Sequence, residues 1–316
     1  MSKLQLLLAT CLALAVLAGC QRDGEKGVHV EPVANKAAAS FAMTEQAWRE
    51  QRRKDLLAPD GWTSLIGLHW IDTGSHDLGS AAGNEIQLSL GPPHMGVLEF
   101  KQGSVRLLPD PSAKLTIDGV PVEAGVVLRT DTAAGGPSVI GFDAGKGAAT
   151  VIERAGRTAL RVKHADAPAR LQFAGLDYWP ADPAWKIEGR FVAHPPGTTM
   201  DIANIIGSVD STANPGVIEF THDGKPYRLE ALDEGEGKLF LVFADRTNGK
   251  GSYGAGRFLY APMPDKDQRV VLDFNQSYNP PCAFTTFATC PLPPPENRLD
   301  LAITSGEKAY RKPPHS

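Results

Sequence analysis

The chain has 316 residues, and its 32 basic and 36 acidic side chains give a formal net charge of −4. A chain of this length can form two domains with a sizeable buried core. The sequence contains no block of basic residues, so its charge distribution argues against a nucleic acid as partner.

The first twenty residues, MSKLQLLLATCLALAVLAGC, predict a signal peptide, because one basic residue precedes an apolar run that ends in small residues. The run is too short and too poorly flanked to remain as a membrane span. Its last four residues, LAGC, resemble a bacterial lipobox, which implies that Cys20 is acylated and that residues 1–19 are removed. Gln21 follows Cys20, and in lipoproteins of that class this implies the outer membrane, with the protein facing the periplasm. An ordinary secretory signal with an incidental cysteine is the alternative.

Residues 20–42 lack an apolar period and are predicted to be a flexible tether. The next stretch, TEQAWREQRRKDLLAPDGW, predicts a helix. Thr44 can cap its start, the basic residues 52–54 lie toward its negative end, and the Pro-Asp-Gly at 59–61 stops it. We expect this helix to pack against a sheet through Trp48 and Leu56.

The remainder of the chain predicts short strands with turns about every eight to twelve residues, which is the pattern of an all-β fold. GVLEFKQGSVRLL and VIERAGRTALRV are predicted hairpins, with turns at 102–103 and 155–156. In the second hairpin Arg161 and Lys163 alternate with apolar residues, so one face of its sheet should be polar. KLFLVFAD is apolar on both faces and is therefore predicted to be a central strand.

We therefore predict a mainly β protein in which an N-terminal helix precedes two β domains. The first domain, residues 43–165 with the helix included, should be a β-sandwich. The second, residues 166–312, should be a β-sandwich or an open barrel that carries a strap rich in proline and cysteine at residues 279–297. The break between them is placed near HADAPAR, residues 164–170.

The strap, NPPCAFTTFATCPLPPPEN, contains two cysteines. Cys11 would be removed with the signal peptide and Cys20 would carry lipid, so Cys282 and Cys290 remain in an oxidising compartment, and we predict a disulfide between them. A zinc site would need further ligands nearby. A thiolate nucleophile would need a basic neighbour, and thiol redox chemistry would favour a CxxC spacing, so both are weaker alternatives.

The sequence contains no G-x-S-x-G, H-E-x-x-H or P-loop motif. GKGSYG at 249–254 matches G-x-G-x-x-G, but a dinucleotide site needs a helix directly after the glycines, and here RFLY and prolines follow. We interpret the motif as a hairpin turn. The histidines are dispersed, so neither a metal nor a cofactor is predicted.

The segments DGWTSLIGLHW, YGAGRFL, VLDFNQSYNPPCAFTTFATCPLPPPEN and SGEKAY resemble a bacterial family known as domain of unknown function 1684, over about residues 45–311. This resemblance implies a shared fold and a set of shared residues, and it implies no established activity.

Within the first domain, GSHDLGSAAGNEIQLSL and LTIDGVPVEAGVVL are similar to the forkhead-associated β-sandwich. Modules of that kind bind phosphothreonine through an arginine after the glycine and a serine before a histidine. Here Ser80 follows Gly79 and Pro93 precedes His94. The resemblance therefore implies the sandwich without phosphopeptide binding.

Polar residues gather where a predicted strand enters the strap. In RVVLDFNQSYNPP the apolar residues alternate onto one face, and the rigid proline-rich loop should then bring later polar residues back to the same place. The strap could simply seal a sheet edge. The alternative is a pocket rim with aromatic faces from Tyr253 and Phe284, suited to a sugar or another small polar ligand. The candidate ligand-binding residues are Arg257, Asp273, Asn275, Tyr278, Glu296 and Asn297.

Two functions of different class follow. The first is a non-catalytic envelope protein, attached to the membrane by its N-terminal lipid, that binds a small polar ligand, a glycan or a partner protein of the envelope. The alternative is a hydrolase in which Asp273 and Glu296 act as acid and base, in environments that push their pKa values apart.

Overall fold

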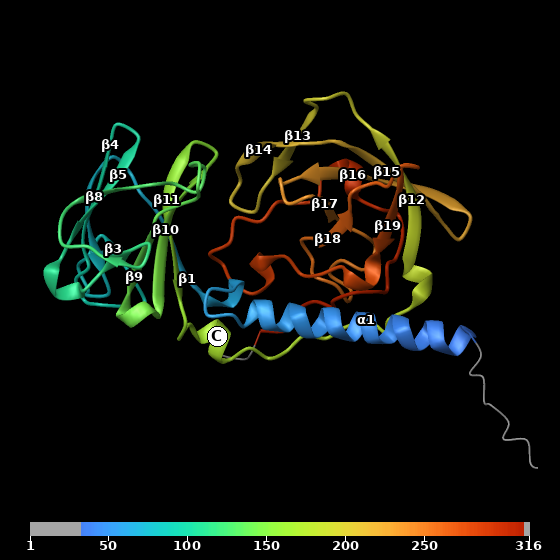
Figure 1. Cartoon of the computed structure of the whole chain (residues 1–316), viewed down its shortest axis with the longest axis horizontal. Helices are drawn as coiled ribbons and strands as arrows, with labels where there is room; N and C mark the ends of the chain where they lie inside the picture. Colours follow the sequence, from blue (N-terminus) through green and yellow to red (C-terminus); the bar gives the residue numbers. More distant parts are fainter. Residues whose placement is uncertain (1–32, 313–316) are drawn as a thin grey trace, which may run out of the picture. The chain divides into compact units, whose positions relative to one another are not determined.

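The computed structural model describes residues 33–312 (Figure 1). The predicted signal peptide, residues 1–19, and the predicted lipidation site, Cys20, lie outside this range. The protein is mainly β, with 41% strand and 16% helix, as the sequence predicts. No helix in the described range is long and apolar enough to span a membrane. Residues from Ser40 to the end of the described range belong to one compact unit, which contains both β domains.

The N-terminal helix α1 (Val33–Leu56) begins well before the position expected from the sequence. The prediction of a flexible tether is therefore wrong for residues 33–42. This segment contains neither glycine nor proline and is rich in alanine, so helix propensity favours a helix even without an apolar period. Thr44, predicted as the cap, lies inside the helix, where its hydroxyl donates to the carbonyl of Ser40 at 3.0 Å.

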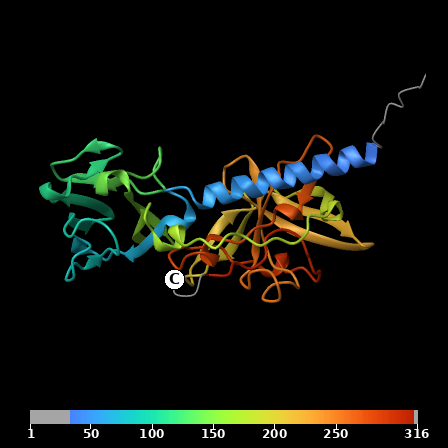
Figure 2. The ribbon, with the colours of Figure 1, turned by 90° about the horizontal axis from the view of Figure 1, so that it is seen from below.

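From Glu45 onward the helix α1 packs against the second β domain (Figure 2). The Glu45 carboxyl accepts a hydrogen bond from Gln276 at 3.1 Å, and Arg52 pairs with Glu307 at 2.9 Å. The buried side chain of Leu56 packs in a small apolar cluster with Phe284. Both ends of this helical segment are therefore fixed to the C-terminal part of the chain.

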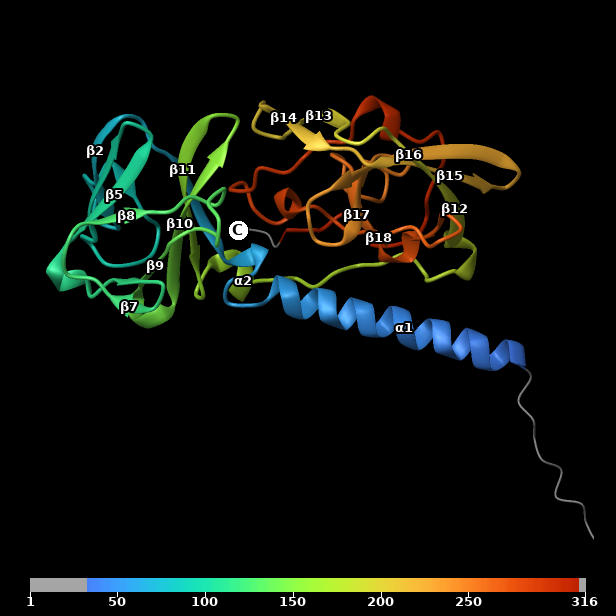
Figure 3. The ribbon, with the colours of Figure 1, turned by 45° about the horizontal axis from the view of Figure 1, so that its top comes forward.

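The first β domain is a sandwich of two sheets around one apolar core (Figure 3). Both hairpins predicted from the sequence are present, with left-handed backbone at Gln102 and Gly103 and again at Ala155 and Gly156. The six-stranded sheet runs in the order β1 (Leu65–Trp70), β11 (Arg157–His164), β10 (Gly147–Arg154), β9 (Val139–Phe142), β6 (Thr116–Ile117) and β7 (Val120–Pro121). The five-stranded sheet runs in the order β3 (Ile86–Gln87), β2 (Gly74–Gly79), β4 (Gly96–Lys101), β5 (Ser104–Pro109) and β8 (Val126–Leu128).

The second β domain follows the short helix α2 (Pro168–Leu171) and is built on one curled sheet. Its two edge strands contact each other, so the sheet approaches an open barrel. The order is β18 (Arg257–Pro262), β17 (Lys238–Phe243), β16 (Lys225–Asp233), β15 (Gly216–His222), β12 (Lys186–Ala193) and β19 (Arg269–Asp273), and a separate two-stranded sheet pairs β13 (Thr199–Ala203) with β14 (Val209–Ala213).

Two smaller predictions in this domain are confirmed. The segment KLFLVFAD forms β17, which lies between β16 and β18 and is almost completely buried. Residues 249–254 lie in the loop between β17 and β18, and the strand β18 follows them rather than a helix. The described chain also has the single-turn 3₁₀ helices η1 (Trp62–Ser64), η2 (Pro111–Ala113), η3 (Asp143–Gly145), η4 (Pro183–Trp185), η5 (Phe274–Gln276), η6 (Pro281–Ala283) and η7 (Pro295–Asn297).

Candidate functional site

Arg257, one of the predicted ligand-binding residues, is a fully buried cross-link of the second domain. Its guanidinium pairs with the equally buried carboxylate of Asp245 and donates to the carbonyls of Ile303, at 2.9 Å, and Ser305. These bonds join β18 to the C-terminal segment. Arg257 is therefore structural, and it lines no described cavity.

Asn297 also holds the strap in place, and Asn275 fixes the turn η5 that precedes the strap. The Asn297 amide donates to the carbonyls of Glu230, at 2.9 Å, and Val242, at 3.0 Å, and its oxygen accepts from the Glu230 N–H at 2.7 Å. The Asn275 side chain exchanges two bonds of 2.9 Å with the backbone of Asp182. The Asn297 amide thus pairs with buried backbone groups, as the strap interpretation requires, whereas the Asp182 backbone that pairs with Asn275 is only partly buried.

The predicted acid and base are not brought together. Asp273 ends β19 and caps η5, and its carboxylate lies 3.3 Å from the Lys186 ammonium. Glu296 is exposed in η7. No described cavity contains either residue and no contact joins them, so the geometry of the described chain gives the hydrolase hypothesis no support.

The two strap cysteines lie side by side but are free thiols in this structure, so the predicted disulfide is not formed there. The turn η6 places the N–H of Cys282 3.1 Å from the sulfur of Cys290, so the two side chains are adjacent. The hydrogen bond between the thiols lowers the pKa of Cys282 and raises that of Cys290.

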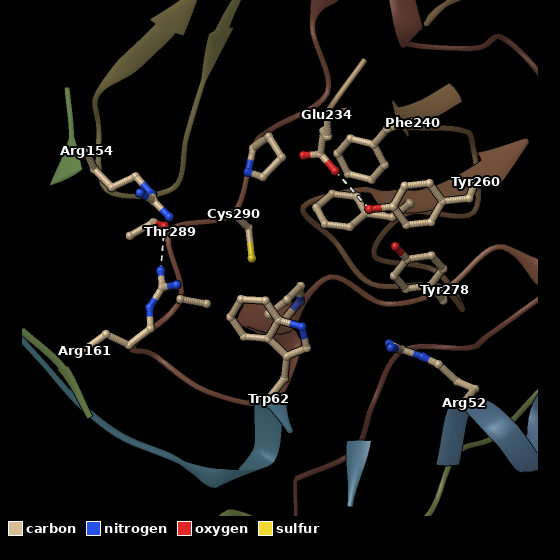
Figure 4. A pocket seen from close by; sticks show the side chains of 14 residues that line it. Arg52, Trp62, Arg154, Arg161, Glu234, Phe240, Tyr260, Tyr278, Thr289 and Cys290 are labelled. Carbon is tan, nitrogen blue, oxygen red and sulfur yellow. Dashed lines mark hydrogen bonds between the residues drawn. The ribbon is translucent and has the colours of Figure 1, made fainter. Parts of the chain in front are cut away.

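A cavity of about 380 Å³ lies where the polar face of β10 and β11 meets the strap and the strands β17 and β18 (Figure 4). Its walls combine guanidinium groups, aromatic rings and one carboxylate. Cys290, Thr289 and Pro281 of the strap complete it. The charged and aromatic lining residues are Arg52, Arg154, Arg161, Glu234, Trp62, Phe240, Phe258, Tyr260 and Tyr278.

The cationic wall comes from the first domain. Arg161, on β11, donates to the Thr289 hydroxyl at 3.3 Å, and burial lowers its pKa to about 10. Arg154, on β10, pairs with Asp131 at 2.6 Å. The centre of the Trp62 ring lies 5.7 Å from the Arg161 guanidinium and 5.8 Å from the Lys163 ammonium.

The opposite wall carries the acid and the phenols. The Tyr260 hydroxyl donates to Glu234 at 2.9 Å, and burial raises the pKa of both groups. The rings of Tyr260 and Tyr278 stack at 6.3 Å, and Arg52 lies 4.4 Å over Tyr278. A second cavity of about 500 Å³ shares these three side chains and continues toward α1.

Of the six predicted ligand-binding residues, Tyr278 alone lines this cavity. The aromatic residues expected beside them take other roles, since Tyr253 donates to the Cys282 carbonyl at 3.2 Å and Phe284 packs against Tyr310. Sequence reasoning missed Arg161, although the polar face of its hairpin was a usable signal. No group of three or more metal-ligating side chains occurs within residues 33–312.

Residues 171–308 match the family described as "Protein of unknown function (DUF1684)". The chain is also similar to a solution NMR structure of an uncharacterised protein from Haloarcula marismortui, with 30% identity over 44% of this chain and 78% of that one, at a TM-score of 0.37. No curated protein matches the chain.

Proposed function

We propose that this chain, whose residues 171–308 belong to the DUF1684 family, binds a small polar ligand in the cavity beside β11. The observation that carries the proposal is the convergence of guanidinium, carboxylate and phenol groups on one aromatic-walled space. Cavities of about this volume that combine apolar walls with a few oriented polar groups are typical of small-molecule sites.

A thermal-shift screen of the full chain, purified in detergent, against sugars, amino acids, nucleotides and lipid head groups tests this function. A ligand that binds the native state raises the melting temperature. Trp62→Ala should abolish the shift, because the indole forms one wall. Trp70→Ala is the matched control, since this β1 tryptophan stacks with Arg157 and does not line the cavity. An equal loss of the shift in both variants would argue against this site.

The proposal includes an envelope location, for which the sequence of residues 1–20 is the support. Acylation of Cys20 would attach the protein to the periplasmic face of the outer membrane. Cys20→Ser should leave the protein unanchored and out of the membrane fraction. Fractionation of the variant with membranes would contradict the lipid anchor.

In that oxidising compartment the adjacent thiols of Cys282 and Cys290 should be joined as a disulfide. Protein recovered from the periplasm should resist alkylation at both cysteines until reductant is added. Protein made in a reducing cytoplasm, with the thiols as they stand in the structure, should be alkylated at both after unfolding. Free thiols in the exported protein would contradict this part of the proposal.

A further inference from the structure

We infer that the ligand of this cavity carries an oxyanion, a carboxylate or a phosphate, and that Arg161 is the residue that binds it. The inference rests on the proposed function and narrows it to a ligand class.

Arg161 is the cavity arginine whose hydrogen-bonding capacity is least used. A guanidinium offers five N–H donors, and here one nitrogen reaches Thr289 at 3.3 Å, while the buried Nε has no partner. By contrast, Arg52 pairs with Glu307 and donates to a backbone carbonyl, and Arg154 pairs with Asp131. No acidic side chain of the described residues forms an ion pair with Arg161. Buried donors are normally satisfied, so the unpaired Nε leaves room for an acceptor supplied by a ligand.

The positive charge around Arg161 also favours the binding of an anion. Its pKa is lowered first by burial and then by the neighbouring cation of Arg154, and Asp131, the nearby acid, is already paired with Arg154. Lys163, two residues further along the same face of β11, adds a third positive charge near Trp62. A bound oxyanion would balance this excess and could accept a fork of two N–H bonds.

The other wall constrains the remainder of the ligand. Figure 4 shows Arg154 and Arg161 on one side of the cavity and Glu234, Tyr260 and Tyr278 on the other. The carboxylate and the two phenols can hydrogen-bond a hydroxyl group of a ligand. The aromatic rings of the cavity can pack against a flat or apolar part of the same ligand. The chemistry that fits both walls is a hydroxylated ring that bears one oxyanion.

Two matched sets of probes test the inference by thermal shift and calorimetry on the full chain. The first set is glucose, glucuronate and glucose 6-phosphate, and the second is phenol, 4-hydroxybenzoate and 4-hydroxyphenyl phosphate. Within at least one set the charged members should bind at least about 10-fold more tightly than the neutral one, as a charge-assisted hydrogen bond implies. Comparison of the carboxylate probe with the phosphate probe in each set shows which of the two oxyanions the cavity prefers.

Arg161→Gln should weaken binding of the charged probe by about 10- to 100-fold and leave the neutral probe unchanged. Its unliganded melting temperature should change little, because in the free protein the guanidinium makes one hydrogen bond of 3.3 Å and no ion pair. Arg161→Lys should recover part of the affinity. Arg190→Gln is the matched control, since this β12 arginine is 71% exposed and pairs with Glu219 away from the cavity.

The outcomes separate this inference from the function on which it rests. Equal binding of neutral and charged probes, abolished by Trp62→Ala, would keep the cavity as a ligand site and overturn the oxyanion. Charged probes that bind Arg161→Gln as tightly as the native chain would overturn the role of Arg161. Failure of every charged probe to bind at millimolar concentration would overturn the ligand class.

Discussion

Replacing Arg257 by methionine tests whether a fully buried ion pair holds the second domain together. The side chain is 0% exposed, and so is that of its partner Asp245. Methionine preserves much of the volume but leaves the carboxylate without its counter-charge and the carbonyls of Ile303 and Ser305 without a donor. The substitution therefore isolates the electrostatic role of Arg257 from its packing.

Breaking a buried ion pair from one side costs about 3–5 kcal/mol, because a charge remains buried without compensation. For a unit of this size the loss corresponds to a fall in melting temperature of about 6–20 °C. Asp245 keeps two bonds from Thr247, so we expect its carboxylate to stay in place and to bear the full penalty. The double variant Arg257→Met, Asp245→Asn removes the unpaired charge and should recover part of the loss.

Urea unfolding followed by tryptophan fluorescence measures the effect, since the midpoint falls while the slope with denaturant stays constant if only stability changes. A loss below about 1 kcal/mol in Arg257→Met would refute the reasoning. A double variant no more stable than the single one would do the same, because the penalty would then not come from the Asp245 charge.

Three further predictions concern the strap and its contacts. Asn297→Ala should lower the unfolding free energy by about 3 kcal/mol, because it leaves three buried backbone groups unpaired. Glu296 is adjacent and exposed, so Glu296→Ala should change the unfolding free energy, measured with urea, by less than about 0.5 kcal/mol. Gly306→Ala should cost at least about 2 kcal/mol, since φ is +78° there and the new Cβ would overlap Ser277; a wild-type thermal midpoint would contradict this. Burial raises the pKa of the Glu45 carboxyl, so the folded state favours its protonated form: the resulting stability is present below the unfolded pKa of about 4.5 and is lost as pH rises through the folded pKa. Glu45→Gln should therefore be more stable than the native chain near pH 7.5, and this advantage should shrink at pH 4. Unfolding curves of both proteins at both pH values measure it, and an absent or reversed difference in stability would contradict the prediction.

The fold was largely predictable because its signals are local. Gln102-Gly103 and Ala155-Gly156 can adopt the left-handed backbone that tight hairpin turns need, and alternating side chains assign the faces of the strands beside them. The start of α1 could not be predicted from apolar periodicity, because residues 33–42 are helical through their composition. Helix propensity alone produces no apolar period in a sequence.

The site was not predictable in the same way. Asp273, Asn275 and Asn297 have the residue types of a binding rim, but the same types serve to pair buried backbone groups, and the sequence does not show which carbonyl lies opposite. Arg161 meets Thr289 across 128 positions of the chain, from one β domain to the strap of the other. Such a pairing depends on the tertiary arrangement and leaves no spacing signal.

The structural and functional interpretations of the strap are compatible, because different residues carry them. Asn297 fixes the strap to β16 and β17, and the Ile205 N–H donates to the Cys290 carbonyl at 2.9 Å. The fixed segment then presents Thr289 and Cys290 to the cavity, where Arg161 approaches from the first domain. Substitution of the fixing residues should therefore reduce binding through lost stability, whereas substitution of Arg161 should reduce binding while the fold remains intact.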